Sequence, residues 1–279
     1  SRAPGSICLS ASHSTSSSAM VDPGIQSPML ASPADSPAKQ VTRHIQPYAG
    51  VTRCYKLPAM SSSPPYLVPH SQEEIRILYE DADLLLVRKP HLLLTIPGRH
   101  PLNKDCLVTR LQQHYPSASI VHRLDLDTSG IMVVPLNKAT HAHISRQFQQ
   151  RTVEKTYHAV VCGILSQDQG EIDLPIATDW ENRPRQMICH ERGRQALTRF
   201  EVLQRGTDRT RVLLKPVTGR SHQLRIHMRE LGHPILGCDM YAHPEALAMA
   251  PRLLLHATTL AFEHPTSGKR LSGECPPDF

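Results

Sequence analysis

The residues best suited to chemistry in this chain lie in one polar segment between two apolar runs. Residues 120–134 read Ile-Val-His-Arg-Leu-Asp-Leu-Asp-Thr-Ser-Gly-Ile-Met-Val-Val, so Arg123, Asp125 and Asp127 separate two stretches that are typical of buried strands. Charged side chains so close to a core need an explanation. The simplest one is a hairpin turn, because Asp, Thr, Ser and Gly are favourable turn residues.

Two other interpretations of this segment involve the carboxylates themselves. The run Asp125-x-Asp127-x-Ser129-Gly130 matches the start of a calcium-binding EF-hand loop, but the twelfth position, where that loop needs a bidentate Glu, is Leu136. In the remaining interpretation, one carboxylate acts chemically while Arg123 and a distant basic partner keep it ionised. These residues alone do not decide between a turn and a reactive carboxylate.

A second polar segment, residues 215–235, supplies cations for such a partnership. We predict a short helix over 222–231, with Ser221 as its N-cap and a Gly-x-Pro sequence behind it. His222 and Arg225 fall at helical spacing near one face, together with a second arginine one turn later. Cations at the edge of a buried helix are costly unless they meet an anion, which can be a carboxylate or a phosphate.

Other side chains in the chain are suited to a nucleic acid. In the predicted strand 156–162, Tyr157 shares a face with apolar residues, where most tyrosines are packing elements. The loop 179–186 contains the only tryptophan and Arg183, a composition suited to base stacking and phosphate contacts but also found in ordinary surface loops. Arg220 precedes the predicted helix, whose N-terminus is suited to a phosphate.

The elements that must position these side chains are hairpins and short helices. We predict hairpins from strands 75–79 and 84–87 and from strands 197–203 and 211–215, and a last strand near 253–262. One further helix is predicted to have Asp105 as its N-cap, and another runs from an Asn137 N-cap to about Gln150. The inward face of the latter is predicted to consist of Ala139, Ala142, Ile144 and Phe148.

Composition excludes several classes of protein. Of the net charge of +6, residues 1–59 carry +3, from five basic and two acidic residues, so the rest of the 279-residue chain is only mildly basic. Seven scattered cysteines without a C-x-x-C pair argue against a disulfide framework or a zinc ribbon and favour a reducing cytoplasm. No metal site, nucleotide cofactor or membrane span is predicted, because no H-E-x-x-H, glycine-rich dinucleotide motif or long apolar run is present.

The first part of the chain has a different composition from the rest. Residues 1–70 are rich in Ser, Pro and Ala and have no sustained periodicity, so we predict a disordered tail before a folded domain over 71–279. Met60 is an alternative start of translation under this hypothesis.

Taken together, the two polar segments resemble motifs of the RluA family of pseudouridine synthases. The resemblance covers about residues 75–279, essentially the whole segment predicted to be ordered, and several motifs occur in the family's order. They are His122-Arg-Leu-Asp125 with Thr128-Ser-Gly130, Lys155-x-Tyr157, Thr218-Gly-Arg-Ser-His-Gln-Leu-Arg225, and Leu255-His-Ala257 with His264-Pro265. This resemblance implies an α/β (α+β) fold, in which helices flank a long, mixed and mostly antiparallel sheet with a central active-site cleft.

The resemblance also implies a reaction and its residues. Uridine within RNA is isomerised to pseudouridine by breaking the N1–C1′ bond, rotating the uracil and forming a C5–C1′ bond, without a cofactor. Asp125 is the essential carboxylate, acting either at C1′ or in a route where Tyr157 takes the C2′ proton, and Arg225 pairs with it. The uridine is flipped out of the RNA, Tyr157 stacks on it, and Arg123 fills the vacated space. The residues expected to bind RNA are His122, Arg123, Arg183, Arg220 and His222.

The expected substrates are 23S rRNA and a tRNA anticodon stem-loop, because Asp179-Trp-x-Asn-Arg-Pro and the stretch 244–252 resemble family members that modify both. Modification of rRNA alone or tRNA alone is the alternative, and a non-catalytic RNA-binding protein on this fold is a further one. We expect a cytoplasmic monomer. Arg88, His91 and Cys238 depart from the family's pattern, which places Asn, a small residue and Asp at those positions.

Overall fold

A ten-stranded sheet organises the part of the chain that the computed structural model describes, residues 43–45 and 67–279. Its strands follow the order β1-β2-β3-β4-β11-β5-β10-β9-β6, and β12 pairs with β11. The strands are β1 (Arg43–Ile45), β2 (Ile75–Glu80), β3 (Leu84–Lys89), β4 (Ser129–Pro135), β5 (Glu154–Cys162), β6 (Gln169–Asp173), β9 (Leu197–Arg205), β10 (Arg209–Pro216), β11 (Leu255–Glu263) and β12 (Arg270–Glu274). A separate two-stranded sheet pairs β7 (Ile176–Thr178) with β8 (Gln186–Ile188).

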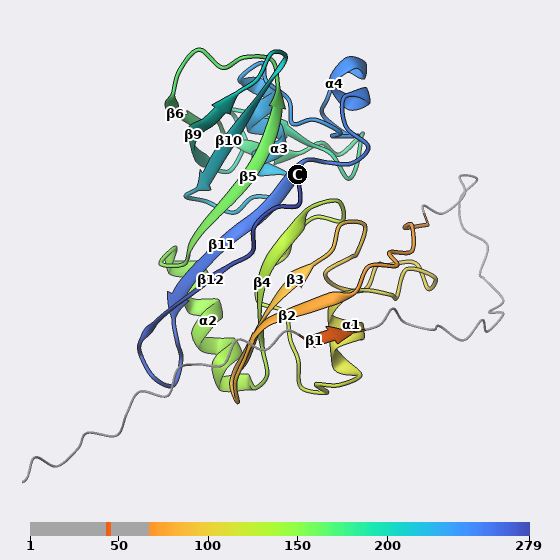
Figure 1. Cartoon of the computed structure of the whole chain (residues 1–279), viewed down its shortest axis with the longest axis vertical. Helices are drawn as coiled ribbons and strands as arrows, with labels where there is room; N and C mark the ends of the chain where they lie inside the picture. Colours follow the sequence, from red (N-terminus) through yellow and green to blue (C-terminus); the bar gives the residue numbers. More distant parts are fainter. Residues whose placement is uncertain (1–42, 46–66) are drawn as a thin grey trace, which may run out of the picture. The chain divides into compact units, whose positions relative to one another are not determined.

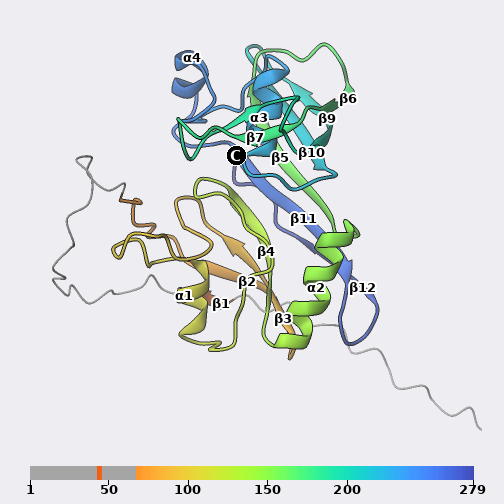
Figure 2. The same ribbon diagram turned by 180° about the vertical axis from the view of Figure 1, so that it is seen from behind.

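The mixed, mostly antiparallel sheet expected from the sequence is confirmed. The predicted hairpins are present as β2–β3 and β9–β10, and the last predicted strand is β11. One contact is parallel, between β4 and β11, where His256 pairs with Ser129 and Ala257 with Gly130. Figures 1 and 2 show β5 and β11 running between β2–β4 on one side and β9 and β10 on the other.

Within the predicted tail, residues 1–70, the structure describes residues 43–45 and 67–70. Residues 43–45 form β1, which pairs antiparallel with β2 and so covers an edge whose backbone groups would otherwise be unpaired. The rest of the predicted tail up to residue 66, with Met60, lies outside the described residues. Among the residues described, no helix has both the length and the apolar character needed to cross a membrane.

The first helix, α1 (Leu107–Gln112), begins one position later than predicted. Its N-cap is Cys106, whose backbone N–H donates to Thr109 Oγ1 at 3.1 Å. Asp105 cannot cap the helix because both of its carboxylate oxygens accept from the Arg110 guanidinium, at 2.7 and 2.6 Å. Arg110 is fully buried, so this ion pair fixes the segment that leads from the core to α1.

The second helix, α2 (Lys138–Gln150), has the predicted cap but a different inward face. The Asn137 side chain accepts from the Thr140 N–H at 2.9 Å, as expected of an N-cap. The buried residues are Thr140, Ile144 and Gln147, whereas the two alanines predicted to face inward, Ala139 and Ala142, are exposed. Gln147 faces inward because its side-chain amide donates to the Glu263 carbonyl of β11 and accepts from the Glu263 N–H, both at 2.8 Å.

The third helix, α3 (Gln223–Glu230), is capped by His222 rather than by Ser221. His222 has a left-handed backbone with φ of 54°, and its side chain is hydrogen bonded to Tyr241 instead of to the helix. The Gln223 side chain, which was not among the predicted site residues, accepts from the Arg220 N–H at 3.0 Å and so restrains the segment that leads into the helix. A short helix, α4 (Pro244–Ala248), follows.

Two hydrophobic clusters meet along β5 and β11. The first is formed mainly by β2, β3 and β4 with α1 and α2, and the second by β5, β9, β10 and α3. Tyr157 of β5 packs against both clusters. Side chains on this strand are therefore placed where the two halves of the core come together.

Candidate active site

A cavity of about 1080 Å³ lies where side chains from both hydrophobic clusters converge. Its walls come from residues 94–96, Arg99, residues 121–126 and Thr128, β5, the loop between β7 and β8, and the segment that leads into α3. All eight predicted site residues line it: His122, Arg123, Asp125, Tyr157, Arg183, Arg220, His222 and Arg225. Residues separated by up to about a hundred positions in the sequence thus meet around one space large enough for a nucleotide.

Asp125 is presented to the cavity by a tight turn, not by the hairpin predicted for this segment. Only β4 is a strand here, because residues 120–128 are irregular, and the Thr128 N–H donates to the Asp125 carbonyl at 3.2 Å. The preceding carbonyl, that of Leu124, accepts from Thr95 Oγ1 at 2.8 Å. The Asp125 side chain remains 30% exposed, so its carboxylate can be reached from the cavity.

Lys89, which the sequence interpretation missed, supports the same turn from the protein interior. Its fully buried ammonium donates to the carbonyls of Pro90, Leu93 and Leu126, at 2.8, 2.7 and 3.2 Å. Burial lowers the pKa of Lys89 to about 7, although the nearby charge of Asp125 opposes that change. The only signal in the sequence is a lysine that ends a largely apolar strand and precedes a proline.

Arg225 is the buried cation of the site. Its side chain is 1% exposed, and Nη1 lies 3.8 Å from Asp125 Oδ2 and 3.7 Å from Asp127 Oδ2. These distances exceed those of a direct hydrogen bond, so the charge of Arg225 acts on the two carboxylates without a hydrogen bond to either. Burial raises the pKa of Asp127, which does not line the cavity, and Asp125 is therefore the carboxylate placed to meet a substrate.

Tyr157 also lines the cavity. It lies in β5 between Leu214 of β10 and Ala257 of β11, which fixes the direction of its side chain. Burial raises the pKa of Tyr157 well above its usual value, and the charge of Asp125 adds to this effect. The hydroxyl is therefore protonated in neutral solution.

His122 contributes a neutral ring to the wall. Its Nε2 accepts the backbone N–H of Val133 at 3.1 Å, and its ring stacks on Phe148 with centroids 4.7 Å apart. Burial, followed by the charge of Lys155, lowers the pKa of His122 to about 3. A positive charge on this residue is consequently disfavoured at the pH of the cell.

His222 and Tyr241 connect the α3 end of the cavity with the β7–β8 loop. Tyr241 Oη accepts from the Gln186 N–H at 2.8 Å and lies 2.7 Å from His222 Nδ1, to which it can donate. This arrangement leaves His222 Nε2 4.0 Å from Asp125 Oδ1. Burial lowers the pKa of His222, while Asp125 opposes the change.

The remaining predicted residues lie around the mouth of the cavity. Arg123 is exposed, and the Arg183 guanidinium lies 3.5 Å from the centroid of the exposed Trp180 ring. Arg220 donates from Nε to the Gln195 carbonyl at 3.1 Å. These cations offer contacts to an anionic polymer at the entrance, while Asp125 and Arg225 lie further in.

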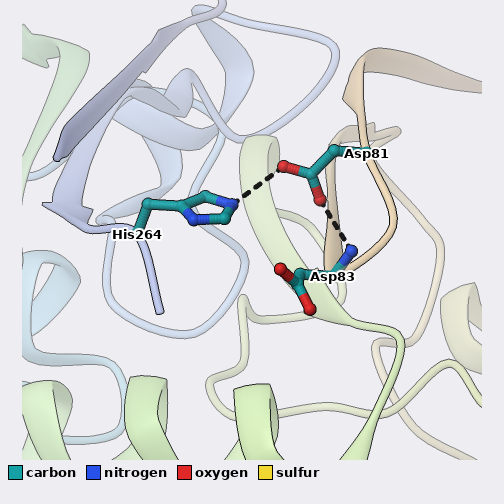
Figure 3. A group of neighbouring side chains, drawn as sticks. All are labelled: Asp81, Asp83 and His264. Carbon is teal, nitrogen blue, oxygen red and sulfur yellow. Dashed lines mark hydrogen bonds and ion pairs between the residues drawn. The ribbon is translucent and has the colours of Figure 1, made fainter. Parts of the chain in front are cut away.

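Away from this cavity, the described residues include one group with the donor types of a metal site, formed by Asp81, Asp83 and His264 (Figure 3). Its atoms already have protein partners. Asp81 accepts from His264 at 2.8 Å and from two backbone N–H groups, and Asp83 accepts from Asn137 at 2.9 Å. The group connects the β2–β3 turn with α2 and the β11–β12 loop, which accounts for its residues without an ion.

The comparison with protein families decides the class of this site. A family model described as RNA pseudouridylate synthase matches residues 83–230, more than half of the chain. The chain belongs to the RNA pseudouridylate synthase family. It is an enzyme that isomerises uridine to pseudouridine in RNA, as the resemblance of its motifs indicated.

Relatives of this synthase are similar over nearly their whole length. It is 52% identical over 204 residues to the dual-specificity RNA pseudouridine synthase RluA of Yersinia pestis, covering 73% of this chain and 99% of the relative. It is 50% identical over 212 residues to the protein of that name from Escherichia coli (strain K12), covering 76% and 97%. Among solved structures, human RNA pseudouridylate synthase domain containing 1 matches with a TM-score of 0.62 and 31% identity, over 78% of this chain and 87% of that one.

Proposed function

We propose that this synthase modifies uridines in both 23S rRNA and a tRNA anticodon stem-loop, with Asp125 as the essential carboxylate. The observation that carries the proposal is the position of Asp125, exposed to a large cavity and 3.8 Å from the buried Arg225. Dual specificity is supported by the relatives that are about half identical over nearly their whole length and bear that name. The alternative, modification of only one of these RNAs, has no particular observation in its favour.

Asp125 acts on the ribose of the target uridine. A carboxylate that reacts must be ionised even though the site shields it from water, and burial alone disfavours the ionised form. A buried arginine beside the carboxylate favours the ionised form. Arg225 supplies this charge without a direct hydrogen bond to Asp125, which leaves the carboxylate oxygens free to approach the sugar. During the reaction the N1–C1′ bond breaks, the C5–C1′ bond forms, C5 loses a proton and N1 gains one, so the product is an isomer of the substrate.

Tyr157 stacks on the uracil in this proposal. Because burial keeps its hydroxyl protonated, Tyr157 is poorly suited to take the C2′ proton unaided. Its ring is held by the strands on both sides and forms a rigid platform inside the cavity. This favours direct action of the Asp125 carboxylate over a route in which the tyrosine is the base.

The burial of Arg225 beside Asp125 implies that the uridine leaves its stack before it reacts. Asp125 and Arg225 lie inside, so a base held in a helix or structured loop cannot reach them in place. The exposed Arg123 lies two residues before Asp125 and is placed to enter the space that the base vacates. Flipping brings the uracil into the cavity that Tyr157 and the neutral ring of His122 line.

Arg183, Arg220 and His222 bind the RNA around the target. The Arg183–Trp180 pair offers a charge and an aromatic face on the β7–β8 loop, and Tyr241 connects this loop to His222. Arg220 is anchored by the Gln195 carbonyl, which restricts the approach of the phosphate to one side. The synthase works on these RNAs as a monomer in the cytoplasm under this proposal.

Mapping of pseudouridine tests the proposed substrates. In cells that lack the gene, we expect uridine to remain unmodified both in 23S rRNA and in a tRNA anticodon stem-loop, and a wild-type copy to restore both modifications. Restoration of only one RNA would contradict dual specificity. Restoration by an Asp125→Asn copy would contradict the catalytic assignment while leaving the substrates correct.

A further inference from the structure

The Arg225 guanidinium meets a different partner at each of its nitrogens. Nη1 faces Asp125 and Asp127 at 3.8 and 3.7 Å, Nε donates to Cys238 Sγ at 3.3 Å, and Nη2 donates to Asp239 Oδ1 at 2.5 Å. Among the described residues, Asp239 therefore receives the one charge-assisted hydrogen bond that Arg225 makes. A thiol is a weak acceptor, and the two other carboxylates lie beyond hydrogen-bonding distance.

We propose that Asp239 is a positioning residue for the isomerisation, which acts by holding Arg225 so that Nη1 faces Asp125. The inference rests on the proposed roles of Asp125 and Arg225. A planar guanidinium that is fixed at Nη2 and Nε can turn its third nitrogen in only one direction. Asp239 does not line the cavity, so it reaches the substrate only through Arg225.

The exposure of Asp239 is compatible with this role. Its side chain is 57% exposed, whereas that of Arg225 is 1% exposed. The second carboxylate oxygen can stay hydrated while Oδ1 holds the guanidinium, so orientation is gained without burying a second charge. The effect is one of geometry at the buried partner and does not depend on a large ion-pair energy.

The segment that carries Asp239 is itself held in place. Gly237 has φ of 67°, and a Cβ there would lie 1.9 Å from the Arg252 carbonyl oxygen, so the chain passes too close for any larger residue. At the other end, the Tyr241 ring lies 5.5 Å from the Arg225 guanidinium carbon, and its hydroxyl is hydrogen bonded to Gln186. Asp239 lies between these fixed points.

Loss of the carboxylate is expected to impair the chemical step and not RNA binding. For Asp239→Ala we expect kcat to fall about 10- to 100-fold, the range of one charge-assisted hydrogen bond, with KM for RNA changed less than about threefold. Released from Nη2, the guanidinium is free to close directly on Asp125, which would occupy the oxygens that must reach the ribose.

Position 238 offers a rescue experiment. Because Cys238 Sγ lies 3.3 Å from Arg225 Nε, a carboxylate at this position would meet the same guanidinium from the adjacent edge. We expect Cys238→Asp in the Asp239→Ala background to recover at least about a tenfold part of the lost kcat. A merely structural role of residue 239 would give no such recovery.

The experiment measures steady-state pseudouridine formation on both RNAs by the full chain and its variants. The matched control is Glu245→Ala, which removes an exposed carboxylate of the same region that bonds His243 and not Arg225; it should leave kcat unchanged. Thermal unfolding of each variant excludes a loss of fold. Asp125→Asn is measured alongside, because its failure to lose activity would refute the proposed function and not only the role of Asp239.

Three outcomes would overturn the inference while Asp125→Asn is inactive. They are an Asp239→Ala variant with kcat within twofold of wild type, a variant whose loss lies entirely in KM, and a folded double variant with no recovery. A kcat defect with near-normal KM that Cys238→Asp repairs would support it.

Discussion

Gly130 is the position at which a single methyl group should do most damage to the active site. It follows the turn that presents Asp125 and lies in β4, where its parallel contact with β11 is made. Its φ is 124°, a region that side chains rarely adopt, and a Cβ would lie 2.2 Å from the Ala257 carbonyl oxygen and 2.5 Å from the Ala257 nitrogen. Both obstacles are backbone atoms, so no side chain can move aside.

The cost of Gly130→Ala can be estimated from these contacts. The strained backbone alone costs about 1–3 kcal/mol. To reach ordinary contact the strands must separate by roughly 1 Å, which also breaks tight packing and the buried 2.8 Å hydrogen bond between Ser129 and His256, for about 1–3 kcal/mol more. We expect the free energy of unfolding to fall by about 2–6 kcal/mol in total, and pseudouridine formation to fall with it.

Urea unfolding of Gly130→Ala and Gly232→Ala distinguishes the cost of the strained backbone from the cost of the close contact between β4 and β11. Gly232 also has a positive φ, of 86°, but nothing lies within 4 Å of a Cβ there, so its substitution should cost only about 1–2 kcal/mol. Gly232→Ala should keep full activity at a temperature where it is folded. If the two variants unfolded within about 1 kcal/mol of each other, the close approach of β4 and β11 would not be what requires glycine at position 130.

Three other predictions follow from single contacts. Asp105→Ala leaves the buried Arg110 without its carboxylate partner and should lower the free energy of unfolding by about 3–5 kcal/mol. Asp168→Ala removes one member of an exposed ion pair and should change the free energy of unfolding by less than about 1 kcal/mol. Equal effects of the two substitutions in urea unfolding would contradict this prediction. The pKa of Lys89 is about 7 in the fold against 10.5 as a free side chain, so the unfolded chain binds more protons between these values and stability should rise with pH there. Lys89→Met should remove that slope, and urea unfolding of both proteins at about pH 7 and about pH 10 would show whether it persists. RNA affinity should fall steeply with salt, and Arg183→Ala should reduce the log–log slope by about 1, as filter binding at several salt concentrations would reveal; an unchanged slope would remove Arg183 from the phosphate contacts.

The features that were predictable from the sequence are those that neighbouring residues determine. The β2–β3 hairpin follows from two apolar runs around an acidic turn, and the α2 N-cap follows from one asparagine before a helical pattern. The eight candidate site residues were identified from motifs, and the structure arranges all of them around one cavity. Their individual roles stay predictions.

The features that could not be predicted depend on residues that are distant in the sequence. Asp125 does not lie in a hairpin because β4 pairs with β3 and β11, which are distant in the sequence, and residues 120–128 form no strand. The helix α3 follows His222, whose left-handed backbone and hydrogen bond to the distant Tyr241 no local pattern predicts. The neighbouring residues do not indicate the roles of Lys89 and Asp239. Lys89 is hydrogen bonded to the Leu126 carbonyl and Asp239 to Arg225, and the fold, not the local sequence, brings each of these partners into contact.

The central claim is that the Asp125 carboxylate performs the isomerisation. Its most direct test is a single-turnover measurement of tritium release from RNA labelled at C5 of the target uridine, with wild type and Asp125→Asn, because C5 loses its hydrogen only when the new bond to C1′ forms. We expect complete release by wild type and no detectable release by Asp125→Asn, although that variant binds the RNA and unfolds at nearly the wild-type temperature. Release by folded Asp125→Asn at a rate close to that of wild type would contradict the claim.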